Sequence, residues 1–252
     1  MNVQTPLFYR NPVVMSREKH ADLRLVADAD YSFASKGASV PLLMREFVAA
    51  SGSMPVVFVT GQDKATSAQA LLAASTEGNK FVEHDGSWRQ GEYIPAYIRR
   101  YPFIFADVPA NAPHEGASTL VLCIDEAAPQ VLRADADRYA DGLALFDNGE
   151  NTDQADRALS FCNLYQRDWL ETQQFIGELQ SMNLLVDRQI ELSWPGEKSA
   201  QRQQKVLQGI ETIDPGRLQQ LSDSKFLRLR KLGYLAPIYA HLSSLARFAR
   251  IV

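Results

Sequence analysis

The sequence predicts an α+β protein, in which a β-rich N-terminal module packs with a long amphipathic helix, a β-hairpin and C-terminal helices. Three observations support this prediction. Short apolar runs separated by turn residues fill about the first 150 residues, as short strands do. Apolar residues then recur at alternating spacings of four and three over residues 152–182, which indicates a helix. Two further apolar runs flank a Pro-Gly turn after that helix.

The clearest strand of the N-terminal module is residues 55–60, because β-branched and aromatic residues dominate it and Gly61 follows. Residues 41–50 predict a short helix, since a proline stands in its first turn and Ser-Gly follows its end. Asp85-Gly86 suits the positive φ angles of a hairpin turn, and residues 108–117 predict a surface loop. Further strands are expected at residues 23–27, 80–83, 102–106, 119–124 and 142–146.

The long helix is expected to carry one continuous apolar stripe. All members of the stripe fall on one face of the helix: Ala158, Cys162, Tyr165, Trp169, Thr172, Ile176 and Leu179. Such a stripe packs either on the chain's own sheet or against a second copy as a dimer seam. We expect the first alternative, because Ala, Thr and Cys are poor seam residues beside Leu and Ile.

The C-terminal part begins with a hairpin of residues 188–193 and 205–213, followed by short helices. Asp214 is expected to cap the first of these, with proline at its first position, and Gly233 to end the second. We therefore expect two parts. Residues 1–150 form the β-rich module with short helices, and residues 151–252 form the long helix, hairpin and C-terminal helices. The two parts are expected to make one compact unit.

Composition places the chain among ordinary globular proteins. Its 252 residues are 46% hydrophobic and 22% charged, so a core of normal size needs no disulfide or metal. Cys123 and Cys162 lie on apolar runs, and we expect both to be small buried hydrophobic residues.

Charge and targeting signals restrict the partners and the compartment. The net charge of −4 predicts no general attraction to nucleic acid or anionic lipid. Residues 217–252 nevertheless hold seven basic residues against one acid, either as a solvated face or as a docking patch. The N-terminus resembles no signal peptide, and no apolar run reaches the ~18–20 residues that span a bilayer. We expect a cytoplasmic protein without a transmembrane segment, unless a route without an N-terminal signal exports it.

His20 and Asp22 are the only candidates for a metal site. Their His-x-Asp spacing matches part of the facial triad of non-haem iron enzymes. That triad needs a second histidine, and only His84, His114 and His241 are present. We expect a surface turn here, no metal and no cofactor, because nucleotide-binding, hydrolase and zinc motifs are also absent.

The candidate binding residues form two groups. The first combines aromatic rings with guanidinium groups, which can stack on a ligand or pair with a carboxylate or phosphate: Tyr93, Tyr97, Arg99, Arg100 and Tyr101. The second is Asp125 and Glu126, which follow directly after an expected buried strand and could act as acid and base. The alternative for both groups is structural, with core packing, ion pairs and helix caps.

Several blocks of this sequence, in order along almost the whole chain, resemble the bacterial SapC family. The most specific block is residues 93–103, Tyr-Ile-Pro-Ala-Tyr-Ile-Arg-Arg-Tyr-Pro-Phe. The others are residues 10–13, 20–24, 31–34, 39–42, 123–126, 145–147 and 239–242.

The resemblance implies an association with bacterial surface layers and no established catalytic residues. Genes of SapC-family members often lie beside genes for outer-membrane receptors and flavin-dependent halogenases. The products of neighbouring genes are therefore the expected partners. We expect a non-catalytic accessory or binding protein of a bacterial cell-surface or nutrient-uptake system. The alternative is an enzyme, such as a metal-dependent oxygenase-type protein, whose site gathers His20, Asp22 and the block from Tyr93 to Tyr101.

Overall fold

The computed structural model describes residues 6–26, 30–75, 78–109, 118–195 and 202–252. The chain forms two compact units: unit 1 comprises Met1–Asp30 and Arg99–Arg167, and unit 2 comprises Tyr31–Ile98 and Asp168–Val252. Each unit is thus built from two chain segments, whereas the sequence suggests one division near residue 150. Helix α3, Asp153–Ser181, belongs partly to each unit. The mixture of antiparallel sheets and helices confirms the α+β class.

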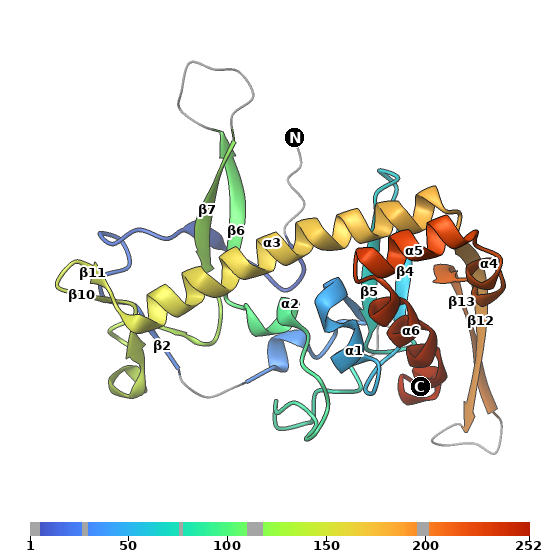
Figure 1. Cartoon of the computed structure of the whole chain (residues 1–252). Coiled ribbons are helices and arrows are strands. Elements are labelled where there is room, and N and C mark those ends of the chain that lie inside the picture. The colour runs from blue at the N-terminus through green and yellow to red at the C-terminus, as the bar shows by residue number, and fades with distance from the viewer. Residues whose placement is uncertain (1–5, 27–29, 76–77, 110–117, 196–201) are drawn as a thin grey trace. The chain divides into compact units, whose positions relative to one another are not determined.

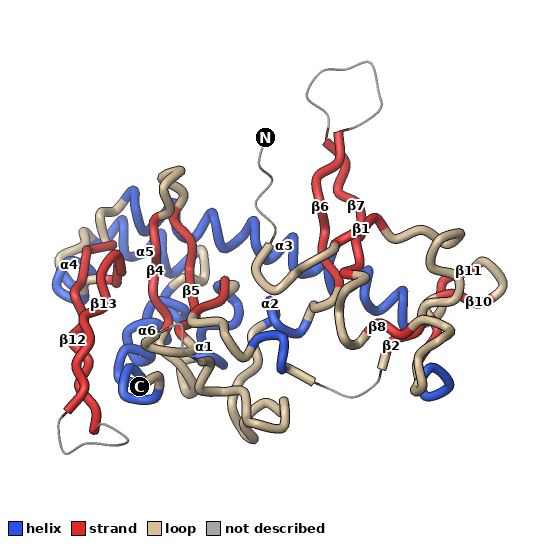
Figure 2. Tube along the Cα trace, turned by 180° about the vertical axis from the view of Figure 1, so that it is seen from behind, coloured by secondary structure: helices blue, strands red, loops and turns tan. Residues whose placement is uncertain are grey.

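Unit 1 is organised around a three-stranded antiparallel sheet in the order β1-β7-β6 (Figure 2). Strands β6, Phe103–Pro109, and β7, Ser118–Asp125, form a hairpin, and β1, Pro12–Val14, pairs with the end of β7. The expected strand 23–27 is shortened to β2. The remaining elements of unit 1 are short: β2 Arg24–Leu25, β8 Val131–Leu132, η3 Tyr139–Asp141, β9 Leu143–Ala144, β10 Phe146–Asp147 and β11 Glu150–Asn151.

Side chains of β7 alternate between two apolar clusters. Ile124 belongs to the larger cluster, which Leu122 and the α3 residues Ala158 and Cys162 also join. Cys123 points to the opposite face of the sheet and packs with Tyr9 in a smaller cluster, because successive strand residues face opposite sides. Strand β7 is therefore buried on both faces at Cys123 and Ile124.

Unit 2 contains a five-stranded antiparallel sheet in the order β12-β13-β4-β5-β3. The first three residues of its central strand β4 are all fully buried, which explains the unbroken apolar run. Strand β5, which the sequence did not indicate, pairs with β4 and places small Ala68 opposite Phe58. The strands are β3 Ser39–Pro41, β4 Val56–Thr60, β5 Thr66–Leu71, β12 Leu185–Pro195 and β13 Arg202–Ile213.

The hairpin of β12 and β13 confirms the expected one and is longer at both ends. Figure 1 shows it as a narrow ribbon. Its register shifts between Arg188 and Ile190, where two residues of β13 oppose one of β12. Gly209 occupies the bulge with φ of +70°, a conformation that glycine adopts without strain.

Helices cover one face of this sheet: α1 and α6 lie in front of β4 and β5 in Figure 1 and behind them in Figure 2. As expected, the Asp214 carboxylate caps α4 by accepting the Arg217 backbone N–H (2.9 Å), and Gly233 with φ of +77° follows α5. The helical elements are η1 Ser32–Ala34, η2 Met44–Glu46, α1 Phe47–Ala50, α2 Ala96–Arg99, α4 Pro215–Gln219, α5 Asp223–Lys231, α6 Leu235–Ser244 and η4 Leu245–Arg250. The expected helix 41–50 is therefore η2 followed by α1.

An aromatic cluster forms the centre of unit 2. Phe47, Phe58 and Phe175 are fully buried, with ring centroids 5.9 to 6.4 Å apart. Tyr234 adds an edge-to-face contact with Phe175 at 5.0 Å. Such contacts add to the stabilisation from area burial, so Phe175 anchors α3 within unit 2.

The stripe of α3 is buried as expected at every position except one. Trp169 is half-buried, whereas Thr172, Ile176 and Leu179 are buried. Phe175, outside the stripe, is fully buried instead. The buried face of α3 is therefore wider than the predicted stripe.

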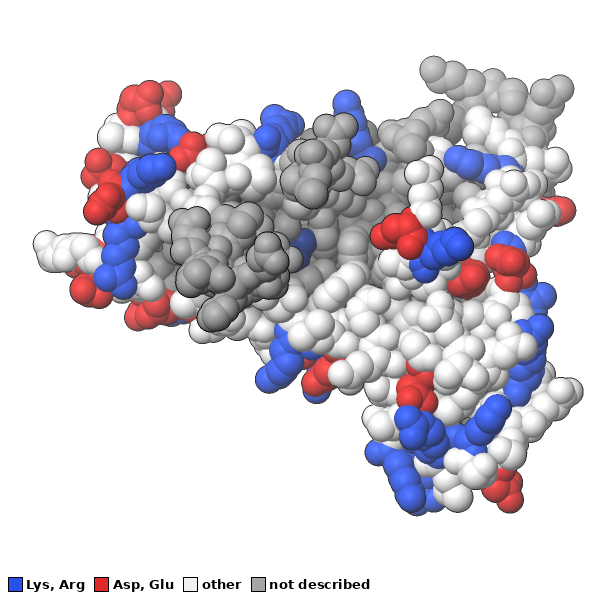
Figure 3. Space-filling view, turned by 90° about the horizontal axis from the view of Figure 1, so that it is seen from above, with Lys and Arg blue, Asp and Glu red and all other residues white. Residues whose placement is uncertain are grey.

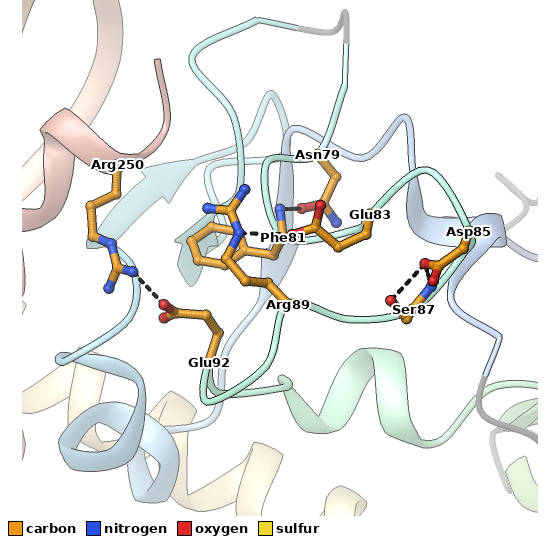
Figure 4. A network of polar contacts seen from close by, with 8 residues as sticks. All are labelled: Asn79, Phe81, Glu83, Asp85, Ser87, Arg89, Glu92 and Arg250. Carbon is orange, nitrogen blue, oxygen red and sulfur yellow. Dashed lines mark hydrogen bonds and ion pairs between the residues drawn. The ribbon is translucent and has the colours of Figure 1, made fainter.

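Residues 79–92 of unit 2 form an irregular segment that polar contacts hold (Figure 4). The Arg89 guanidinium donates to Glu83 (3.0 Å), and Arg250 pairs with Glu92. Asp85 accepts from the Ser87 backbone N–H (2.9 Å), and Gly86 has the positive φ (+83°) expected for this turn. The strand expected at 80–83 is wrong, because only one isolated bridge joins Val82 to Trp88.

His241 on α6 lies inside unit 2 with no exposed surface. Its Nε2 accepts the backbone N–H of Ile213 (3.0 Å), and its ring lies 5.1 Å from that of Phe58. Burial lowers the pKa of His241 to about 4. The backbone of Val56 raises this pKa and so offsets the effect of burial in part. The Nδ1 atom makes no hydrogen bond of good geometry. The folded protein therefore favours the neutral ring.

We expect His241 to make unit 2 sensitive to acid. A histidine whose folded pKa lies below its unfolded value of about 6.5 contributes stability above pH 6.5, and that contribution is lost as pH falls through 4. The loss should reach about 3 kcal/mol, since one pKa unit corresponds to about 1.4 kcal/mol. Urea denaturation should show this extra loss in the native chain relative to His241→Gln, which keeps an acceptor for Ile213. Parallel pH profiles for the two chains would contradict it.

Candidate binding surface

The candidate aromatic and arginine block is divided between the two units. Tyr93 and Tyr97 belong to unit 2, whereas Arg99, Arg100 and Tyr101 belong to unit 1. No single unit therefore contains the whole block.

In unit 2, both tyrosines of the block are packed into the structure. The Tyr93 hydroxyl donates to the buried Glu46 carboxylate (2.8 Å), and the Tyr93 backbone N–H donates to Ser53 (2.9 Å). Glu46 also accepts the backbone N–H of Ala96 (2.6 Å). The ring of Tyr97 is buried. These contacts fix the chain that leads into α2.

Asp125 is a fully buried carboxylate with four hydrogen-bond donors around it. Its Oδ1 accepts the backbone N–H groups of Asn11 (2.8 Å) and Ala127 (3.1 Å). Its Oδ2 accepts the backbone N–H of Arg10 (2.9 Å) and the hydroxyl of Tyr101 (3.2 Å). Burial and this carboxylate raise the pKa of Tyr101. Asp125 thus joins the N-terminal segment to the end of β7.

Glu126, the next residue in the chain, pairs with His20. The buried His20 ring accepts the Ser16 backbone N–H at Nδ1 (2.9 Å), so its Nε2 carries the proton and donates to Glu126 (3.1 Å). Arg133 pairs with the other oxygen of Glu126 (3.1 Å). Both ring nitrogens of His20 are therefore engaged within unit 1.

Asp22 does not share the environment of His20, since its residue is exposed while the His20 ring is buried. The backbone carbonyl of Asp22 accepts the Tyr139 hydroxyl (2.8 Å). Among the residues that the structure describes, no group of three His, Cys, Asp or Glu side chains could hold a metal ion.

Both cysteines are free and buried, which confirms their expected environment. Burial raises the pKa of Cys162 to about 11 and also raises that of Cys123. Neither thiol has the lowered pKa of a reactive cysteine.

The two arginines of the block stack on aromatic rings of unit 1. The Arg100 guanidinium lies 4.3 Å from the ring centroid of Tyr165 and 6.0 Å from that of Tyr9, and the residue is half-buried. The Arg99 guanidinium lies 5.4 Å from the ring centroid of Phe161, and Arg99 is exposed. Arg100 therefore contributes to packing, whereas Arg99 remains accessible.

Phe161 also lines a shallow, open hollow along the first half of α3. Leu164, 45% exposed, lies one turn further along. The lining residues follow one face of the helix: Asp153, Asp156, Arg157, Ser160, Phe161 and Leu164. We call Arg99, Arg157, Phe161 and Leu164 the Arg99 surface. It combines the exposed Leu164 and the half-buried Phe161 with two exposed cations.

The sequence indicated only one member of this surface, Arg99. Phe161 and Leu164 carry a signal that could have revealed the rest, because both are large apolar residues of α3 outside the predicted stripe: Phe161 flanks it, and Leu164 lies further round the helix. A helix that buries one face does not need large apolar residues on the other.

Fold and site together define an α+β chain in which Asp125, Glu126 and His20 bind neighbouring groups of the chain. The side chains of Arg99 and Leu164 are exposed, and that of Phe161 is half-buried. Comparison with family models identifies it further: the SapC model matches residues 15–251, and the chain belongs to the SapC family. Neither the curated proteins nor the solved structures provide a match. Within the described residues, we find no helix with the length and apolar character needed to cross a membrane.

Proposed function

We propose that this SapC-family chain is a non-catalytic binding protein that recognises a partner protein through the Arg99 surface. Its wider setting, a bacterial cell-surface or nutrient-uptake system with partners from neighbouring genes, is part of the same proposal. The observation that carries it is the exposed Arg99 guanidinium stacked 5.4 Å above Phe161, beside the exposed Leu164.

The chemistry of this surface resembles the centre of a protein interface. Arginine and aromatic residues are enriched among the side chains that dominate binding energy, and a neighbouring apolar residue excludes water from them. Stacking on Phe161 restrains the Arg99 side chain, so less conformational entropy is lost when it pairs with a carboxylate. The fitting partner therefore presents an apolar side chain next to an acidic one.

The environments of the other candidates favour binding over catalysis. A general acid or base needs an atom that can reach a substrate. Asp125 uses both oxygens for donors of its own chain, and His20 uses both ring nitrogens. The alternative of a metal-dependent oxygenase would require His20 to give up one of these hydrogen bonds.

Photo-crosslinking in the cells from which the gene comes tests this proposal. The chain carries benzoylphenylalanine at position 164, or at the similarly exposed Leu143 of the same unit as the control. We expect one partner to be captured from position 164 and not from position 143. Equal capture at both positions, or none at 164, would contradict the proposal.

The variant Arg99→Ala should weaken that partner's binding about tenfold, or about 1.4 kcal/mol, as for an interface arginine of moderate importance. Its thermal stability should stay unchanged, because Arg99 is exposed. The matched control is Arg17→Ala, since Arg17 is an exposed arginine of unit 1 that pairs with the exposed Glu150. Titration of the purified partner measures both affinities, and equal losses in the two variants would count against the Arg99 surface.

A further inference from the structure

Basic side chains are unevenly distributed on the surface of this protein. Figure 3 shows Lys and Arg grouped at the lower right of that view, with fewer acidic residues among them. In the chain, the densest basic segment is α5, Asp223–Lys231, which holds four bases and one acid. The overall charge of −4 therefore conceals a local positive surface.

Three of the four bases of α5 are available to an external partner. Arg228 donates to Glu178 of α3 (2.7 Å). Lys225, Arg230 and Lys231 are exposed, and within the described parts of the chain no ion pair or side-chain hydrogen bond involves them. Their charge is not neutralised inside unit 2.

Exposed apolar residues accompany these charges. Leu227 on α5 is 45% exposed, and Leu232, directly after the helix, is 44% exposed. Tyr239 on the following helix α6 is 51% exposed. Leucines among unpaired bases, followed by an exposed tyrosine, match the composition of helices that lie at the surface of an anionic membrane.

We propose that α5 docks unit 2 onto an anionic phospholipid surface, without insertion across it. A fluid layer of headgroups accepts Lys and Arg alike, because it imposes no fixed geometry. An acidic protein partner would favour Arg and deplete Lys, yet two of the three unpaired bases are lysines. This inference concerns unit 2 and does not rest on the Arg99 surface.

Sedimentation with vesicles of phosphatidylcholine and phosphatidylglycerol, mixed in a ratio of about two to one, tests the inference on the full chain. The native chain should bind these vesicles and not vesicles of phosphatidylcholine alone. Raising salt from about 0.1 M to about 1 M should release it, because the Debye length falls from about 10 Å to about 3 Å.

Charge reversal of the three bases, Lys225→Glu, Arg230→Glu and Lys231→Glu together, should weaken vesicle binding about 100-fold or more. The matched control reverses the charges of Lys36, Lys64 and Lys80, which are exposed lysines of unit 2 outside α5. Its fold loss of vesicle affinity should be less than a tenth of that of the α5 variant. Leu227→Ala should weaken binding by about fivefold, because the exposed half of its side chain no longer contributes. Circular dichroism checks that every variant folds.

Three results would overturn the inference. The first is equal binding of the native chain to neutral and anionic vesicles. The second is the same loss of affinity in the two triple variants. The third is binding of the chain to immobilised poly-L-glutamate but not to anionic vesicles. The last result would assign α5 to an acidic protein partner instead.

Discussion

Replacing Asp125 by alanine is expected to lower the free energy of unfolding of unit 1 by about 3–5 kcal/mol. The change leaves the backbone N–H groups of Arg10, Asn11 and Ala127 without the acceptor that they share. These hydrogen bonds are partly buried, and each donor left unpaired costs about 1 kcal/mol or more. All three tryptophans lie in unit 2, so the loss is best measured by hydrogen exchange of the β6–β7 amides in denaturant.

The control for Asp125→Ala is Asp135→Ala, which removes an exposed carboxylate of the same unit and should cost under about 0.5 kcal/mol. If Asp125 were instead a catalytic or ligand-binding group, its removal would leave stability unchanged or raise it, as functional sites often hold strain. A loss below about 1 kcal/mol would therefore contradict the structural role assigned here.

Phe175→Ala is expected to cost unit 2 about 3–5 kcal/mol, the usual cost of truncating a buried aromatic side chain. Phe175 is fully buried and contacts Phe47, Phe58 and Tyr234. Its loss leaves a cavity that rigid neighbouring rings fill poorly. Urea unfolding followed by tryptophan fluorescence measures the change.

Trp169→Ala provides the comparison for Phe175→Ala. Trp169 is the larger residue, but it is half-buried, so its truncation should cost about half as much or less. Because that variant loses a reporter, both losses are also measured by far-UV circular dichroism. A larger loss for Trp169→Ala, or a midpoint that rises with protein concentration, would show that the second half of α3 packs against another chain.

The local elements of this fold follow from the sequence where one pattern dominates. The run Val56–Thr60 is recognisable because β-branched and aromatic residues fill it. The helix Asp153–Ser181 is recognisable because apolar residues repeat at helical spacing. Strand β5 was missed, since Thr66–Leu71 alternates small and polar residues that become strand-like only beside β4. The two-unit division was also beyond local patterns, because residues 31–98 join residues 168–252 only through tertiary packing.

The sequence identifies candidate binding residues by their composition but does not indicate how they group in space. The block from Tyr93 to Tyr101 stands out for its aromatic and guanidinium groups, yet its candidate residues belong to different units, and Arg99 is the one among them that is exposed. The hydrogen bonds of Asp125 with Arg10 and Asn11, and that of His20 with Glu126, join residues 106 to 115 positions apart. No spacing rule reveals such contacts, so the sequence alone does not predict the structural role of these groups.

Hydroxyl-radical footprinting of the full chain tests the central claim of partner recognition most directly. Oxidation of Phe161 and Leu164 is measured with and without the partner captured from position 164, and Leu143 serves as the internal reference. We predict that oxidation of both Phe161 and Leu164 falls severalfold in the complex while that of Leu143 stays constant, and that Arg99→Ala restores it. Unchanged oxidation of Phe161 and Leu164 in a saturated complex would contradict the Arg99 surface as the binding site.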